Sequence, residues 1–291
     1  MRKGAIYLIT LAFWGCSSDP VVVPETGTTT TLVLHATQTI TPGIQADSLL
    51  TNGTAVGVFV TQHQSSPAGA FCSNKEFTVT ADGSLTAADT VYLTEHFSYD
   101  IYGYAPYAPI LTNPGEIEFA HGTDVLWCPK VTLTNVTQNN RSALLHFEHR
   151  MAQISFNVGF DERYNGSKLF TTASEISITG FCSKGKLNIE TGNIVPSGGF
   201  DVKIHANAQP NEKGDIVLTV PRTCFIAADE PMKLVIQVKH ANETFKAGLE
   251  EVFNSGTSYK YTVKIAHVPE LTLSGKVLDW RLMDDDTVIV E

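Results

Sequence analysis

Residues 99–107 read Tyr-Asp-Ile-Tyr-Gly-Tyr-Ala-Pro-Tyr, and this stretch decides the class of fold. Side chains alternate between the two faces of an extended strand, so Tyr99 lies on one face and Tyr102 and Tyr104 lie on the other. Aromatic residues on both faces are typical of a strand that is packed on two sides, and Pro106 ends the run. We expect a buried strand whose tyrosine hydroxyls bond polar partners; a platform for stacking carbohydrate is the alternative.

Further strand-like segments lie on both sides of this stretch. They are rich in β-branched residues or alternate with a period of two, and turn signals such as Asn52-Gly53 and Asp82-Gly83 separate them. No amphipathic pattern is longer than two helical turns, and no short fixed repeat is visible. We expect strands at 31–36, 55–61, 76–81, 99–104, 125–133, 143–147, 153–160, 175–179, 216–220, 232–239, 259–267 and 271–274.

Short strands at this spacing predict an all-β protein built from β-sandwiches. The chain has 291 residues, which suits two sandwiches of about 125 residues each better than one. The polar stretch 161–174, which contains Asn165-Gly166, is the expected break between them. The predicted organisation is a signal peptide at 1–15, a tether at 16–30, an N-terminal sandwich at 31–165 and a C-terminal sandwich at 166–291.

The N-terminus predicts export and lipidation. Arg2 and Lys3 precede an apolar run at 4–14, which is too short to span a bilayer and is typical of a secretory signal peptide. Gly15 and Cys16 follow, an order that resembles the bacterial lipoprotein signal, in which the cysteine is acylated. We predict that Cys16 carries lipid and that the Pro-, Gly- and Thr-rich segment after it is a flexible tether. An ordinary signal peptide with a cysteine near its cleavage site is the alternative.

Composition excludes several classes of protein. Hydrophobic residues make up 43% and charged residues 17%, as in a folded globular chain. The net charge is −10, and no basic cluster follows Lys3, so we expect no nucleic-acid partner. No later segment is apolar for eighteen residues, so no transmembrane helix is predicted.

Four cysteines remain after Cys16, namely Cys72, Cys128, Cys182 and Cys224. In an oxidising compartment they could form two disulfides, but their wide spacing is not that of a disulfide framework. Each has an aromatic or apolar neighbour, which favours buried free thiols.

The sequence contains no catalytic constellation, and we predict neither enzyme activity nor a cofactor. No nucleophile elbow, zinc-protease helix or phosphate-binding glycine loop occurs. His146 and His149 are three residues apart on a predicted strand and therefore face opposite sides, so they cannot chelate one metal ion. We interpret His149 as a hydrogen-bonded core histidine. The acidic run at 284–286 could hold Ca²⁺ weakly, although a solvated acidic loop is favoured.

Three blocks of sequence resemble a known family. They are the tyrosine-rich stretch at 99–107, Leu-Leu-His-Phe-Glu-His-Arg-Met-Ala-Gln-Ile-Ser-Phe at 144–156, and Ser-Gly-Thr-Ser-Tyr-Lys-Tyr-Thr-Val at 255–263 with Asp279-Trp280 after it. With the lipoprotein-type start, they resemble the fimbrillin-like (Mfa-like) lipoproteins of anaerobic Gram-negative bacteria. The resemblance implies two tandem transthyretin-like β-sandwiches on the outer-membrane surface. It also implies a subunit, anchor or tip of a donor-strand pilus (fimbrium), or a related cell adhesin.

In donor-strand polymers, a segment of one subunit fills a groove that a missing strand leaves in the next. In the stalk subunits of the resembled family, a trypsin-like protease first cuts after a basic residue and releases the first strand. This chain has no Lys or Arg between Lys3 and Lys75. We therefore predict that it keeps its lipid and first strand and acts as an anchor or accessory subunit, or as a non-polymerising adhesin. The candidate first strand comprises Thr31, Leu32, Val33, Leu34, His35 and Ala36.

The C-terminal tail is strongly β-prone, and either it closes its own sandwich or it adds as a strand to another pilus subunit. The candidate donor strand comprises Thr287, Val288, Ile289, Val290 and Glu291.

The alternative function is a surface glycan-binding lipoprotein of a nutrient-capture system. That function needs exposed aromatic residues, and beyond the predicted signal peptide the only tryptophans are Trp127 and Trp280. If a host or bacterial surface ligand exists, we expect its contacts in the polar loops 61–73 and 135–141, which should be exposed and free to vary.

Overall fold

The computed structural model describes residues 27–38, 48–109, 113–160, 170–227, 230–265 and 271–279. These residues form strands and one 3-10 helix, η1 (Pro67–Gly69), and contain no α-helix, so the all-β prediction is confirmed. The strands up to residue 160 are β1 (Thr29–Thr31), β2 (Val33–Gln38), β3 (Ser48–Leu49), β4 (Ala55–Gln62), β5 (Cys72–Val79), β6 (Ser84–Thr86), β7 (Tyr92–Thr94), β8 (Tyr99–Ala105), β9 (Ile117–Ala120), β10 (Leu126–Leu133), β11 (Ser142–His149) and β12 (Ala152–Phe160).

The later strands are β13 (Glu175–Phe181), β14 (Lys184–Leu187), β15 (Ile194–Pro196), β16 (Val202–Asn207), β17 (Gln209–Pro210), β18 (Ile216–Phe225), β19 (Met232–His240), β20 (Glu243–Glu251), β21 (Thr257–Ile265) and β22 (Leu271–Asp279). Every strand expected from the sequence overlaps one of these. Nine strands were not expected from the sequence: β3, β6, β7, β9, β14, β15, β16, β17 and β20. Nothing in the described part of the chain is a helix long and apolar enough to cross a membrane.

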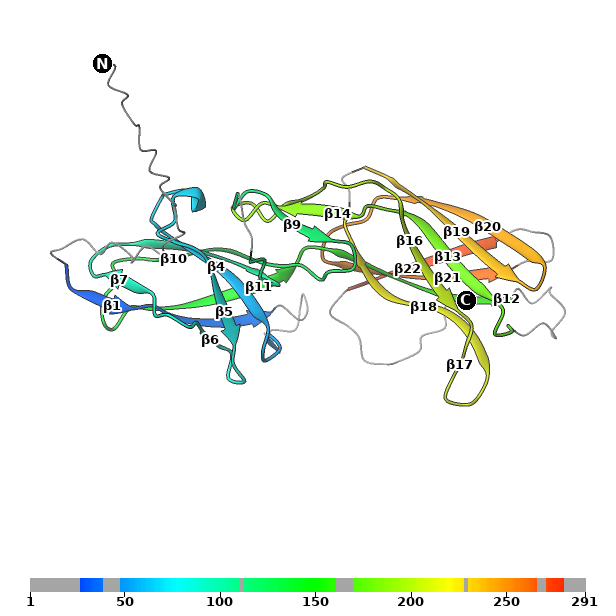
Figure 1. Ribbon diagram of the computed structural model, residues 1–291, viewed down its shortest axis with the longest axis horizontal. Helices are drawn as coiled ribbons and strands as arrows, with labels where there is room; N and C mark the ends of the chain where they lie inside the picture. Colours follow the sequence, from blue (N-terminus) through cyan, green and yellow to red (C-terminus); the bar gives the residue numbers. More distant parts are fainter. Residues whose placement is uncertain are drawn as a thin grey trace, which may run out of the picture.

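The N-terminal lobe comprises β1 to β8, β10 and β11 (Figure 1). Its main sheet has the order β11-β10-β8-β4-β5-β6-β2-β3, and β2 also pairs with β11. That extra pairing closes the sheet into a ring around one apolar core. The central strand β8 is buried along its whole length, as the aromatic residues on both of its faces predict.

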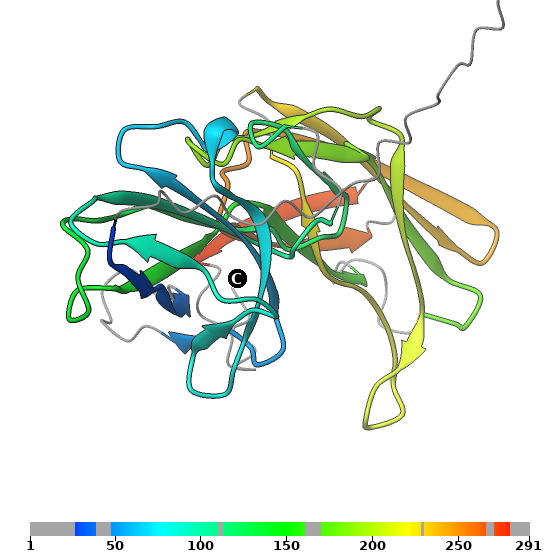
Figure 2. The same cartoon turned by 60° about the vertical axis from the view of Figure 1, so that its left-hand side comes forward.

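The C-terminal lobe comprises β12, β13 and β16 to β22 and consists of two open sheets (Figure 1). One has the order β17-β18-β12-β21-β22 and the other the order β16-β13-β19-β20. The inward side chains of both sheets form one core, in which Phe156 stacks on Tyr261 with 5.5 Å between ring centroids. The hairpin of β17 and β18 projects from this lobe (Figures 1 and 2).

A third sheet, β15-β14-β9, joins the two lobes, because β9 comes from the N-terminal half of the chain and its partners come from the C-terminal half. Beneath it lies a further apolar cluster. At its centre Trp127 donates a buried indole hydrogen bond to the carbonyl of Ile189 at 2.8 Å, and the Arg150 guanidinium lies 4.9 Å from the Trp127 ring. Gly192 is required here because a Cβ on it would lie 2.5 Å from that ring. The lobes therefore share a packed junction. The predicted boundary at 165/166 lies among residues 161–169, outside the described ones. The sheets change earlier, between β11 and β12, because β12 pairs with β18 and β21 of the C-terminal lobe.

Candidate interaction site

Strand β2 is the best candidate for a functional element, because it completes the ring of the N-terminal lobe. It runs parallel to β11, with Val33 opposite Ser142 and Gln38 opposite Phe147. On its other edge it pairs antiparallel with β6, where Leu34 faces Leu85. Without β2, both β6 and β11 would present unpaired backbone groups on either side of a gap.

The side chains of β2 alternate between core and surface. Leu34 is 2% exposed and Ala36 is fully buried. Losing the strand would therefore uncover apolar pockets as well as backbone groups, which is the kind of groove that strand addition fills.

Polar contacts hold the outward side of β2. His35 lies 3.3 Å from the Ser84 hydroxyl, and the Thr37 hydroxyl lies 3.2 Å from His146 Nδ1. At the end of the strand, the Gln38 amide contacts His149 Nε2 at 2.6 Å. His149 Nδ1 in turn lies 2.8 Å from an Asp124 carboxylate oxygen. This histidine is thus hydrogen-bonded and largely buried, as expected from the sequence.

The predicted first strand is divided between two strands of the structure. Thr31 ends β1 and pairs with Tyr92 of β7, whereas Val33 begins β2. Between them the Leu32 N–H donates to the carbonyl of Val91 at 2.9 Å, and the Val33 N–H donates to the carbonyl of Arg141 at 3.0 Å. The chain therefore changes partner from β7 to β11 at Leu32, which sequence periodicity does not reveal.

The other proposed site residues lie outside the described part of the chain. These are Cys16 and the candidate donor strand Thr287, Val288, Ile289, Val290 and Glu291. The strand nearest to that tail, β22, stands at the edge of the five-stranded sheet and ends at Asp279.

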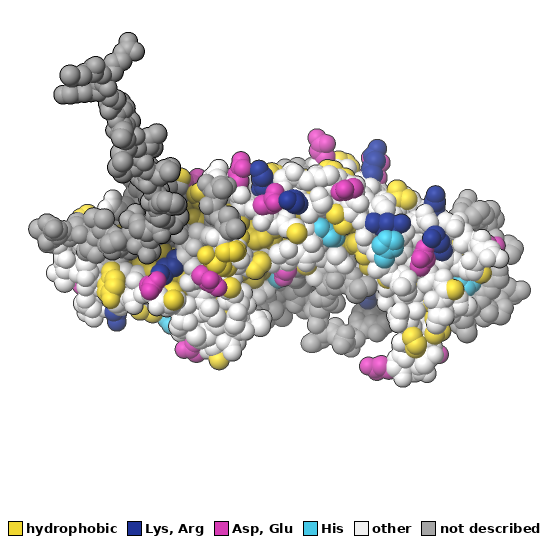
Figure 3. Space-filling view, viewed as in Figure 1, with side chains coloured by type: hydrophobic (Ala, Val, Ile, Leu, Met, Phe, Trp, Pro, Cys, Tyr) yellow, Lys and Arg dark blue, Asp and Glu magenta, His cyan; other side chains and the backbone are white. Residues whose placement is uncertain are grey.

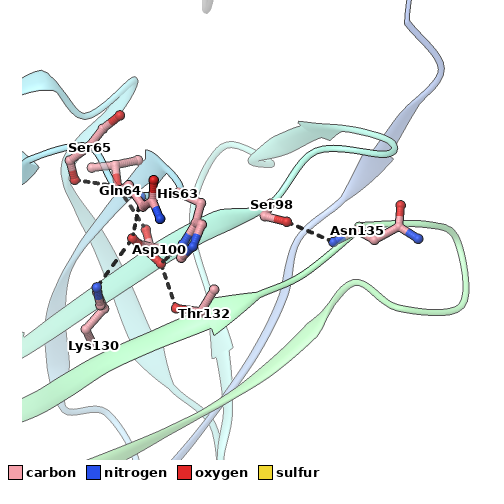
Figure 4. A network of polar contacts seen from close by, with 9 residues as sticks. His63, Gln64, Ser65, Ser98, Asp100, Lys130, Thr132 and Asn135 are labelled. Atoms are coloured by element: carbon pink, nitrogen blue, oxygen red, sulfur yellow. Dashed lines mark hydrogen bonds and ion pairs between the residues drawn. The ribbon is translucent and has the colours of Figure 1, made fainter.

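The predicted contact loop 61–73 is held by a buried carboxylate (Figure 4). The Asp100 side chain has no exposed surface, and its oxygens accept hydrogen bonds from the Thr132 hydroxyl at 2.6 Å and from the backbone N–H of Gln64 at 2.9 Å. His63 Nδ1 lies 2.9 Å from the same carboxylate, and Lys130 Nζ lies 3.6 Å away. Burial acts to raise the pKa of Asp100, but the bonds from Thr132, His63 and Gln64, together with the charge of Lys130, outweigh it and lower that pKa.

This loop is exposed at many positions, as expected, but hydrogen bonds fix it to the rest of the protein. Its 3-10 turn is capped by the Ser66 hydroxyl, which also donates to a Glu190 carboxylate oxygen at 2.9 Å. Glu190 belongs to the C-terminal half of the chain, so the loop reaches the junction between the lobes. Phe71, at the end of the loop, is 38% exposed and packs edge-on against Tyr99.

Neither Trp127 nor the tyrosines of β8 form an exposed platform for stacking carbohydrate, although Phe71, Tyr92, Phe97 and Phe200 are exposed. Trp127 is buried in the junction. The Tyr104 hydroxyl bonds the Asn74 side chain at 2.6 Å, and burial raises the Tyr104 pKa to about 12. Tyr104 therefore packs in the core with its hydroxyl satisfied, as predicted. Trp280 lies outside the described residues.

Within the described residues, none of the cysteines Cys72, Cys128, Cys182 and Cys224 forms a disulfide. Cys72, Cys128 and Cys182 are buried, and Cys224 is half-buried. Burial raises the pKa of Cys72 to about 11 and that of Cys128 to about 12, so these thiols are poor nucleophiles. No group of side chains within the described ranges could hold a metal ion.

The fold resembles that of several solved bacterial surface proteins. A candidate cell-adhesion protein from Bacteroides ovatus aligns with a TM-score of 0.66 at 17% identity, over 88% of this chain and 100% of the other. A second candidate cell-adhesion protein, from Bacteroides uniformis, aligns with a TM-score of 0.62 at 19% identity, over 86% and 99%. A fimbrial protein from Bacteroides vulgatus aligns with a TM-score of 0.51 at 13% identity, over 86% and 99%.

The chain thus has the all-β fold of bacterial cell-surface proteins. The fimbrillin-like family model matches residues 37–280, and the chain belongs to that family. No curated protein sequence matches the chain. Membership in this family implies a location at the cell surface and a pilus-related role in adhesion, in a family of structural and adhesive proteins rather than enzymes.

Proposed function

We propose that this protein is an outer-membrane fimbrillin-like lipoprotein that acts as the anchor or an accessory subunit of a pilus. It consists of two tandem transthyretin-like sandwiches, is held to the membrane by lipid on Cys16 and is joined to other subunits by strand addition. The central observation is the absence of Lys and Arg between Lys3 and Lys75. A trypsin-like protease then has no residue to cut after between Lys3 and Lys75, and the chain keeps both its lipid and its first strand.

The structure adds support to this proposal, because the first basic residue after Lys3 is an unfavourable cleavage site. Lys75 lies within β5, pairs with Val58 of β4 and contacts the Asp89 carboxylate at 3.3 Å. A protease needs an extended, accessible segment, which a residue inside a paired strand does not offer. The next basic residue, Lys130, lies in β10 and faces Asp100.

The N-terminus of the protein on intact cells tests retention of the first strand. Mass spectrometry of the surface-exposed protein should find a mature chain that begins at Cys16. A mature N-terminus beyond Gln38 would mean that β2 has been removed, and the anchor proposal would then fail.

Metabolic labelling with an alkyne-bearing palmitate analogue tests the lipid. The wild-type chain and the control Ser17→Ala should take up the label, and Cys16→Ser should not. Equal labelling of Cys16→Ser would exclude this site of attachment.

The role of the tail can be separated from its effect on stability. We propose that residues 287–291 donate a strand to a neighbouring subunit, with closure of the chain's own sandwich as the competing role. Replacing these five residues with a Gly-Ser segment of equal length should then leave the melting temperature of the monomer unchanged and abolish its incorporation into fibres. A lowered melting temperature in the isolated protein would instead indicate self-closure.

The cellular role is tested by deleting the gene. We expect altered piliation in electron micrographs and reduced adherence to host or bacterial cells. If piliation and adherence are both unchanged and the protein binds a neutral glycan, the nutrient-capture alternative replaces this proposal.

A further inference from the structure

The four-stranded sheet of the C-terminal lobe has an outer face with an unusual composition. Alternate side chains of its strands pack into the core, and those between them lie on the opposite side of the sheet. We call this surface the outer face. It consists of Lys203, His205 and Asn207 of β16, Glu175, Ser177 and Thr179 of β13, Lys233, Val235, Gln237 and Lys239 of β19, and Thr244, Lys246, Gly248 and Glu250 of β20.

The outer face carries an excess of positive charge although the chain as a whole is acidic. It has four lysines and two glutamates. Lys239 pairs with Glu175, and Lys233 Nζ lies 3.6 Å from a Glu250 carboxylate oxygen. Lys203 and Lys246 form no ion pair with any described residue. Figure 3 shows several basic side chains and histidines, with a few acidic ones among them, on the lobe over which Figure 1 labels β13, β16 and β19.

The two halves of the chain differ in their balance of acidic and basic residues. Between residues 27 and 160 there are ten acidic and four basic residues, whereas between 170 and 265 there are ten of each. The C-terminal lobe therefore carries most of the cations, and the outer face collects four of them on one surface. An anionic partner that approaches the molecule will be repelled by the N-terminal lobe and attracted to this face.

The strand register orders the polar groups into rows. His205, Ser177, Gln237 and Lys246 lie side by side across the four strands. With about 4.8 Å between neighbouring strands, the row spans about 14 Å. Ser177 is buried between its neighbours, so the row offers the imidazole of His205, the amide of Gln237 and the ammonium group of Lys246. These groups can bond both the hydroxyls and the anionic groups of a sugar chain.

We propose that the outer face binds an acidic polysaccharide, one that carries carboxylate or sulfate groups along its length. A protein partner would require apolar anchors, and Val235, at 45% exposure, is the one large apolar side chain on this face. A nucleic acid would be recognised through arginines and stacked aromatic residues, and the face has neither. Lysines that alternate with hydroxyl and amide groups suit a hydrated polyanion instead. This activity is separate from the pilus role, so either can fail without the other.

The test measures binding of the full mature chain to immobilised heparin and polygalacturonate, with neutral dextran as the control surface. We expect binding to both acidic polymers and none to dextran, with affinity that falls as salt rises. The variant Lys203→Gln/Lys246→Gln should bind at least five-fold more weakly. The matched control is Lys260→Gln/Lys264→Gln, which removes the same charge from β21 of the other sheet and should change affinity by less than two-fold.

The result is decisive in either direction once the melting temperatures of both variants match the wild type. Equal losses in the two variants would mean that net charge alone attracts the polymer, which overturns a site on the outer face. Failure to bind either acidic polymer would also overturn it. Binding to anionic phospholipid vesicles in preference to both polymers would assign the face to a membrane surface instead.

Discussion

The two lobes differ in whether the edges of their main sheets are paired or open. In the N-terminal lobe, β2 bonds both β6 and β11 and completes a ring. In the C-terminal lobe, β17, β22, β16 and β20 all end open sheets. Open edges can accept another strand directly, whereas a closed ring can accept one only after its own strand leaves. If strands are exchanged between subunits, the first lobe must therefore lose β2 first, whereas the second lobe has edges that are already open.

The lobes differ in charge as well as in the edges of their sheets. The N-terminal lobe is acidic, and its fully buried carboxylate Asp100 fixes a loop. The C-terminal lobe is balanced in charge and carries four of its lysines on the outer face. The closed ring therefore belongs to one lobe, and the lysine-rich outer face to the other.

The largest expected effect comes from removing a buried phenylalanine from the core of either lobe. Comparing the two losses tests whether the closed sheet of the N-terminal lobe makes its core more tolerant of a cavity. Phe147 in the first lobe and Phe156 in the second are both fully buried. Replacing either with Ala should lower the free energy of unfolding by about 3–5 kcal/mol, because removing the phenyl group leaves a large cavity in the core. Urea unfolding followed by circular dichroism measures both. The exposed control Phe200→Ala should change little. A much smaller loss for Phe147→Ala would show that the closed ring tolerates cavities better.

A pair of glycines compares the packed sheet with the open face. A Cβ on Gly57 would lie 2.2 Å from the ring of Tyr104, whereas nothing lies within 4 Å of one on Gly248. Gly57→Ala should therefore cost about 3 kcal/mol through overpacking, and Gly248→Ala should be neutral or slightly stabilising. Thermal and urea unfolding measure both. A substantial loss in Gly248→Ala would show that the outer face is covered in the folded protein, which would also count against the polysaccharide site.

The Asp100 network predicts a pH dependence confined to the N-terminal lobe. The folded pKa of Asp100 lies below the unfolded value of about 3.9. The carboxylate thus stabilises the fold above that value, and this contribution is lost as the pH falls through 3.9 towards the folded pKa. At pH 7, Asp100→Asn should cost about 1.5 kcal/mol, since two charged hydrogen bonds become weaker.

Melting temperatures between pH 3 and 7 measure this effect. The difference between wild type and Asp100→Asn should shrink as the pH falls, because the wild-type carboxylate becomes protonated. The control Asp215→Asn removes a carboxylate from an exposed turn of the C-terminal lobe. In this variant the melting temperature should fall with decreasing pH as it does in the wild type. A pH-independent difference would mean that Asp100 acts through packing alone.

The smallest expected effect concerns the junction. Lys184 contacts Glu118 at 2.7 Å across the β9–β14 pair, and both side chains are about half exposed. Because solvent screens such pairs, Lys184→Gln should leave the melting temperature within about 1 °C of wild type. Trp127→Ala, in contrast, should separate the lobes in small-angle scattering. A marked loss of stability in Lys184→Gln would show that ion pairs rather than the apolar cluster hold the junction.

Strand periodicity was predictable, and long-range pairing was not. Alternating apolar residues located β4, β8, β12 and β19 within a few residues of their ends. The pattern missed β20, where Phe245, Ala247 and Leu249 alternate with charged residues and glycine. It also missed β16, whose inward residues are only partly buried. The outer face went unrecognised for this reason, because half of its strands carry a weak apolar signal.

The sequence by itself determined the all-β class, the family blocks, the acidic charge and the absence of Lys and Arg between Lys3 and Lys75, because these are properties of residue type and local period. Only the tertiary structure decided that β2 closes a ring, that Trp127 is buried between the lobes and that lysines of three strands share one face. Those facts depend on which strands become neighbours. That choice is made by burial of apolar surface between segments far apart in the chain, and no local pattern records it.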